Sequence, residues 1–159
     1  MKSSPIDLEL LFPQLKSLFE NYKVDLAYLF GSQARGEAGP LSDVDVAVQF
    51  AATTTEEEVN DYRLRLMVDL QSVFGRNDVQ VVDLASASPL LRHRVYRDGK
   101  LLYARDDRIR VAFLEQALRD YVDTKPLRRI QAHYLHKSIR AGTFGRPKHL
   151  RKLGSLDNG

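Results

Sequence analysis

Apolar positions near the start of the chain recur at the spacing of an α-helix. Leu15, Leu18, Phe19 and Tyr22 fall on one helical face, the pattern of a helix that packs against a core. Pro13 precedes them, and proline suits the first helical turn because the amide hydrogen that it lacks has no helical partner there. The pattern predicts a helix whose first turn contains Pro13.

Four short runs of β-forming residues predict strands. The first run ends abruptly at a Gly-Ser pair, and the second alternates, as in a strand with one buried face. The predicted strands are residues 24–30, 43–50, 79–83 and 100–104.

Three further helices are predicted around these strands. Thr55 and Glu58 have the spacing of a capping box, and Gly75 is suited to end the helix that they open. Shorter helices are predicted at 88–99 and from 106 onward. The interleaved order predicts an α/β (α+β) fold in which a small mixed β-sheet packs against helices.

Three aspartates on the predicted strands are candidate metal ligands. Asp43 and Asp45 lie two residues apart, so their side chains share one face of a strand at a Cα separation of about 6.6 Å. Two neighbouring carboxylates repel each other unless a cation lies between them, and oxygen ligands suit Mg²⁺. Asp83 ends the next predicted strand, and strand pairing could bring it to the same edge. Three carboxylates could hold two metals about 3.5 to 4 Å apart.

The Gly31-Ser32 turn before these aspartates is a candidate phosphate cradle. Glycine permits a sharp turn and a close approach of the backbone to a phosphate. If Ser32 opens a short helix through Arg35, its free amide groups and its hydroxyl form an anion site. A phosphate site and a metal site would then lie at the ends of adjacent strands, which is the arrangement of a nucleotide-binding site.

Charge is distributed unevenly along the chain. Of the 24 Lys/Arg and 21 Asp/Glu residues, nine Lys/Arg and no acid fall within 124–156, and one acid, Asp157, follows this range, so residues 1–123 hold 15 basic and 20 acidic residues, a net charge of −5. This divides the chain into a domain, 1–123, that contains the candidate nucleotide site, and a basic C-terminal extension, 124–159, that is partly helical or flexible. An acid-free basic segment indicates an anionic partner, either nucleic acid or an acidic protein surface.

The absence of cysteine excludes disulfides and thiolate metal sites. No apolar run has the length of a membrane span, and the N-terminus lacks the features of a signal peptide. A cytoplasmic location without membrane contact is therefore expected.

The segment GSQARGEAGPLSDVDVAV at 31–48 resembles the G-S-x-A-R-G-x(5)-S-D-x-D signature of minimal nucleotidyltransferases in the DNA polymerase β-like superfamily. Every fixed position of the signature is matched, by Gly31, Ser32, Ala34, Arg35, Gly36, Ser42, Asp43 and Asp45. The resemblance covers about 24–104, and Asp83 is matched only by its place in a strand.

This resemblance implies transfer of a nucleoside monophosphate, usually AMP from ATP, to a hydroxyl group with release of pyrophosphate. Asp43 and Asp45 would hold Mg²⁺ or Mn²⁺, and Asp83 would ligate a second metal and help to deprotonate the acceptor. Gly31 and Ser32 would grip the phosphates, with Arg35 and Ser42 beside them.

The small size resembles the branch of stand-alone MNT antitoxins, which adenylylate a tyrosine of a HEPN ribonuclease toxin and would form a hetero-oligomer with it. Two other functions stay open: nucleotide transfer to a small molecule, and neutralisation of a toxin by binding alone. The intact acids favour an active enzyme, whereas the short chain leaves little room for the substrate domain of a small-molecule enzyme.

Overall fold

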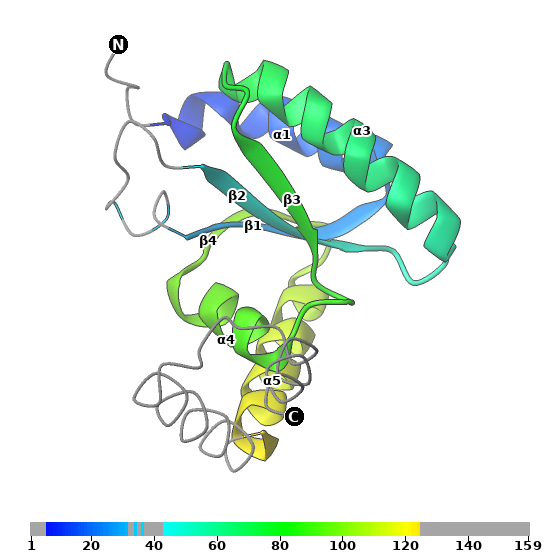
Figure 1. Ribbon diagram of the computed structural model, residues 1–159, viewed down its shortest axis with the longest axis vertical. Coiled ribbons are helices and arrows are strands. Elements are labelled where there is room, and N and C mark those ends of the chain that lie inside the picture. Colours follow the sequence, from blue (N-terminus) through cyan, green and yellow to red (C-terminus); the bar gives the residue numbers. More distant parts are fainter. Residues whose placement is uncertain (1–5, 32–33, 35, 37–42, 125–159) are drawn as a thin grey trace, which may run out of the picture. The chain divides into compact units, whose positions relative to one another are not determined.

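The computed structural model describes residues 6–31, 34, 36 and 43–124. Within these ranges it contains four helices with at least ten residues each and four strands (Figure 1). In chain order the elements are α1 (Leu8–Asn21), β1 (Val24–Phe30), β2 (Val44–Phe50), α3 (Glu56–Phe74), β3 (Val79–Asp83), α4 (Pro89–Asp98), β4 (Lys100–Ala104) and α5 (Asp107–Asp123). The predicted α/β class, with a small mixed sheet and helices, is confirmed.

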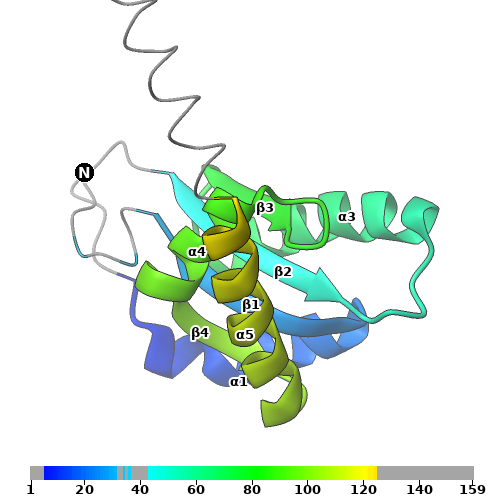
Figure 2. The same ribbon diagram turned by 90° about the horizontal axis from the view of Figure 1, so that it is seen from below.

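The four strands form one sheet in the order β3-β2-β1-β4. β1 pairs antiparallel with both β2 and β4, whereas β2 and β3 are parallel. Parallel neighbours need a crossover connection, and α3 supplies it between β2 and β3. Helices α1 and α3 cover one face of the sheet, and α4 and α5 cover the other (Figures 1 and 2).

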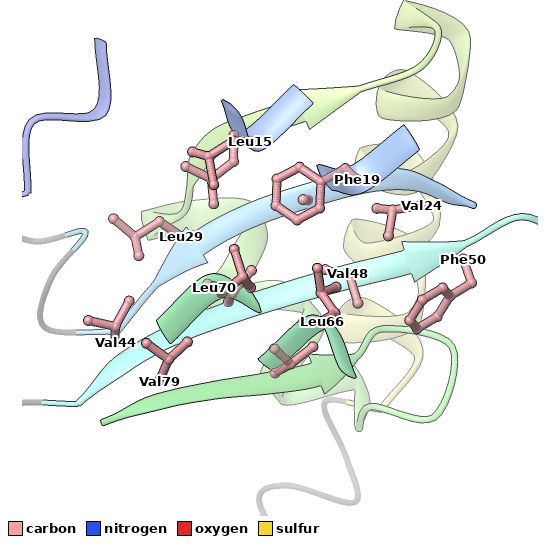
Figure 3. Packing of buried hydrophobic residues seen from close by; sticks show 14 of the residues in the cluster. Leu15, Phe19, Val24, Leu29, Val44, Val48, Phe50, Leu66, Leu70 and Val79 are labelled. Carbon is pink, nitrogen blue, oxygen red and sulfur yellow. The ribbon is translucent and has the colours of Figure 1, made fainter. Parts of the chain in front are cut away.

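The larger core lies between the sheet and the pair α1 and α3 (Figure 3). Leu15 and Phe19 of α1 and Leu66 and Leu70 of α3 are fully buried. They meet the valines that β2 and β3 project toward them, which are Val44, Val46, Val48, Val79 and Val81. A smaller core on the opposite face is built from Leu26, Tyr28, Ala47, Leu84, Val95, Phe113 and Ala117. Burial on both faces makes the central strands a rigid base for side chains at their ends.

Helix α3 has the termini that its sequence predicts. The Thr55 hydroxyl accepts a hydrogen bond from the Glu58 amide at 3.2 Å, and the Glu58 carboxylate accepts one from the Thr55 amide at 2.9 Å. Gly75 ends the helix in the left-handed region, at φ 65°. The crossover between β2 and β3 therefore has a defined beginning and end.

The prediction that Pro13 lies in the first helical turn is wrong. Helix α1 begins at Leu8, so Pro13 lies inside it. At this position proline removes the amide hydrogen that would donate to the Glu9 carbonyl. The start at Leu8 is compatible with packing, because Leu8 and Leu11 lie partly buried against the core.

The chain divides into two compact units, Met1–Tyr121 and Val122–Gly159. Apart from Thr124, the predicted basic extension 124–159 lies outside the described residues. Among the helices that the structure describes, none has the length and apolar character required to cross a membrane.

Candidate active site

Alternation along β2 separates the acidic residues from the core. Val44, Val46 and Val48 are fully buried on the face covered by α1 and α3. Asp45 therefore projects from the opposite face, where it is half-buried, and Asp43 is exposed immediately before the strand. The predicted i, i+2 pair of carboxylates is thus on one face of the sheet.

Gly31 holds the chain unusually close to Asp45. It follows β1 directly, and Phe30, its neighbour in the chain, pairs with Asp45 across β1 and β2. Gly31 adopts φ +75°, and a Cβ atom at this position would lie 2.7 Å from Asp45 Oδ2. Both the backbone conformation and the space require glycine here. The turn at the end of β1 and the carboxylate on β2 therefore belong to one site.

The remaining parts of the predicted phosphate cradle are only partly described. Ala34 is helical and buried in the larger core, which ties the segment after Gly31 to the sheet. Ser32, Arg35 and Ser42 lie outside the described residues. Their phosphate-binding roles stay predictions.

The electrostatics of the pair favour a bound cation. Burial raises the pKa of Asp45, and the negative charge of Asp43 raises it further. Burial and the Asp43 charge both disfavour the ionised form of Asp45. A cation between the two carboxylates would favour that ionised form. An empty pair is therefore less favourable than a pair that holds a cation.

The expectation that strand pairing brings Asp83 to this edge is wrong. In the parallel register, Asp45 pairs with Gln80, whereas Asp83 pairs with Val48. Asp83 lies three residues further along the strand than Gln80, a distance of about 10 Å. Alternation also places Asp83 on the face of Val48 and Val81, which is the side of α3.

Local contacts agree with this placement of Asp83. Its Oδ1 accepts a hydrogen bond from the Ala85 amide at 3.1 Å, which is the contact of a turn residue at a strand end. Asp83 also lines a pocket together with Thr54, Glu56 and Asn60, at the start of α3. Asp83 thus belongs to a surface on the other side of the sheet from Asp45.

Gln80 is the functional-site residue that sequence reasoning missed. Its side chain is exposed beside the two aspartates, and its Nε2 donates a hydrogen bond to Asp43 Oδ2 at 3.3 Å. The alternation Val79-Gln80-Val81 in the sequence does indicate that Gln80 faces away from the valines. Only the register of β2 with β3 shows that it stands next to Asp45.

The donor set fits one Mg²⁺ ion. Asp43 and Asp45 supply anionic oxygens, Gln80 hydrogen-bonds Asp43 through its amide nitrogen, and phosphate oxygens of a nucleotide would provide further ligands. Within the described part of the chain, no group of three or more acidic, histidine or cysteine side chains could hold a metal. The predicted cluster of three aspartates is therefore not formed.

Comparison with known proteins agrees with the sequence signature. Residues 13–108 match the model of the family "Polymerase beta, Nucleotidyltransferase". The chain is 41% identical over 90 residues to the protein adenylyltransferase MntA of Shewanella oneidensis, a match that covers 56% of this chain and 61% of MntA. The matched region thus spans about three fifths of that relative.

Two solved structures share the fold. The tri-AMPylated Shewanella oneidensis HEPN toxin in complex with MNT antitoxin contains a chain that is 28% identical, with a TM-score of 0.64, over 81% of this chain and 98% of that one. A toxin–antitoxin structure with AMP-PNP contains a chain that is 31% identical, with a TM-score of 0.63, over 76% and 94%. The resemblance to minimal nucleotidyltransferases is confirmed, and the chain belongs to the polymerase beta nucleotidyltransferase family.

Proposed function

We propose that the protein is an adenylyltransferase antitoxin that transfers AMP from ATP to a tyrosine hydroxyl of a HEPN-type toxin. The observation that carries this proposal is the pair of carboxylates on Asp43 and Asp45, of which Asp45 lies against the Gly31 turn. The chain that carries this pair matches the nucleotidyltransferase family. The similar chain from Shewanella oneidensis is called a protein adenylyltransferase, and a similar solved complex contains an AMPylated HEPN toxin. These names support a HEPN toxin as the acceptor protein, and the tyrosine is part of the proposal.

In the proposed reaction the acceptor oxygen attacks the α-phosphorus of ATP. The new O–P bond forms as the bond from the α-phosphorus to the bridging oxygen breaks, pyrophosphate leaves, and the hydroxyl proton passes to solvent. Asp43 and Asp45 would hold Mg²⁺ or Mn²⁺, which neutralises phosphate charge when bound. Asp45 is fixed by its place in β2, and Gly31 lets the turn after β1 lie directly against its carboxylate.

Nucleotide binding is the first test of this proposal. Calorimetry with ATP and Mg²⁺ should show binding to the wild type and a loss of at least tenfold in affinity for the Asp43→Ala/Asp45→Ala double variant, since a charged contact contributes about 1.5 to 3 kcal/mol. Asp61→Ala, which changes an exposed acid on α3, is the matched control. Equal affinity in all three proteins would contradict the proposal.

The acceptor is tested by transfer of label from α-labelled ATP. The protein is mixed with a HEPN toxin, and the labelled product is compared with that of a toxin whose acceptor tyrosine is changed to phenylalanine. Label that stays on the phenylalanine variant would exclude tyrosine as the acceptor, and label found on a small molecule alone would favour a small-molecule transferase.

One observation favours a second candidate, an antitoxin that binds nucleotide and neutralises its toxin mainly by contact. Gln80 stands where a third carboxylate could face Asp43 and Asp45. Toxin inhibition that survives the Asp43→Ala/Asp45→Ala change would identify this mode, whereas inhibition that requires both acids and ATP supports transfer.

A further inference from the structure

The parallel register of β2 and β3 fixes which side chain of β3 faces the carboxylate pair. Asp45 pairs with Gln80, and both lie between valines that point into the larger core. Their side chains therefore emerge on the same face of adjacent strands, which are about 4.8 Å apart. The hydrogen bond from Gln80 to Asp43 shows that this amide reaches the acidic site.

The other acidic residues that the structure describes near this edge do not supply a third carboxylate beside Asp43 and Asp45. Asp78 precedes β3, but its carboxylate forms two hydrogen bonds with Arg76, at 2.8 and 2.5 Å. The Arg76 guanidinium holds the pKa of Asp78 below its usual range, and the Asp78 carboxylate is ion-paired with Arg76. Asp83 lies three residues beyond Gln80 and on the opposite face.

An amide and a carboxylate differ in the ions that they support. Two carboxylates and a nucleotide can hold one divalent ion, as their negative charges attract it and their oxygens coordinate it. A second ion about 3.5 to 4 Å away is repelled by the first and needs further negative charge. Gln80 adds a dipole but no charge, and its amide nitrogen points to Asp43 instead of offering an oxygen there.

We infer that Gln80 limits this site to a single divalent ion, the one that accompanies the triphosphate, and that it acts as a positioning residue for Asp43. The inference rests on the proposed nucleotide site. A carboxylate at position 80 would complete a two-ion site, and Gln80→Glu is the closest such change because glutamate has nearly the same shape. Gln80 is exposed, so this change leaves the core intact.

The test is the number of Mn²⁺ ions bound per bound nucleotide, measured by electron paramagnetic resonance with α,β-methylene-ATP, which cannot transfer AMP. The wild type should bind one ion and Gln80→Glu two, with the spin coupling of neighbouring ions. Asp83→Asn is the matched control, because it removes the alternative third acid, and it should bind one ion. Two ions in the wild type, or one in Gln80→Glu, would overturn the inference.

A second measurement separates this inference from the proposed function. If the Asp43→Ala/Asp45→Ala variant still binds Mn²⁺ and nucleotide as the wild type does, the nucleotide site itself is misplaced and both ideas fail. If that variant loses the ion while Gln80→Glu gains none, the site stands and only the role of Gln80 fails. Thermal unfolding of Gln80→Glu shows whether it is folded, and Mn²⁺ should raise its melting temperature more than that of the wild type.

Discussion

Replacing Gly31 by alanine should disable the site more than it weakens the fold. The added Cβ would lie 2.7 Å from Asp45 Oδ2, whereas an ordinary contact begins at 3.4 Å, so the carboxylate or the turn must move by about 0.7 Å to restore an ordinary contact. Displacing a reacting group by ~1 Å can reduce a rate by ~100-fold. We therefore expect AMP transfer to fall by about 10- to 100-fold. The positive φ of +75° adds a folding cost of about 1 to 2 kcal/mol.

Gly75→Ala is a matched control for the backbone strain. Gly75 has φ +65°, but a Cβ atom there would meet nothing within 4 Å. Urea unfolding should show a similar loss of about 1 to 2 kcal/mol in both variants. Transfer from α-labelled ATP and binding of α,β-methylene-ATP with Mn²⁺ should then fall only in Gly31→Ala. Equal transfer rates in the two variants, measured where both are folded, would refute the steric argument.

Four further results are expected. Asp83→Asn should leave nucleotide affinity and the rate of AMP transfer within about twofold of the wild type, since Asp83 pairs with Val48 and faces α3. A large loss of transfer would show that Asp83 acts in the active site. Gln80→Glu should raise the transfer rate by about tenfold or more, because the second ion that the added carboxylate holds would help to deprotonate the acceptor hydroxyl; a lower rate in a folded variant would argue against it. The Asp69 hydrogen bond, aided by burial, raises the pKa of Tyr22 to about 12, so this contact should stabilise the fold fully below pH 10 and be lost as the pH rises through 12. Ultraviolet titration should show a late-titrating tyrosine that is missing in Tyr22→Phe, and an unchanged curve would exclude the contact. Truncation after Asp123 should remove salt-sensitive binding to a toxin or to RNA, because residues 124–156 carry nine basic residues and no acid; undiminished binding of both would exclude a docking role.

Much of the framework follows from local sequence. Strands β1, β3 and β4 have the predicted limits, and β2 begins at Val44, one residue after the predicted start. The capping box of Thr55 and Glu58 is formed. These features depend on contacts between residues close together in the sequence, so a local sequence pattern is enough to predict them. Pro13 is the exception, because helix α1 continues through a residue that usually begins a helix.

The sequence by itself determined that Asp43 and Asp45 share a face of one strand and follow a Gly-Ser turn, since these relations need only the two-residue period of a strand. The tertiary structure alone decided which residue of β3 stands beside them. Val79–Asp83 offers both Gln80 and Asp83, and the choice depends on the register of two strands joined by the 19-residue helix α3. That register is set by the packing of Val44, Val46 and Val48 with Val79 and Val81 against α1 and α3, a contact between distant segments that no local pattern encodes.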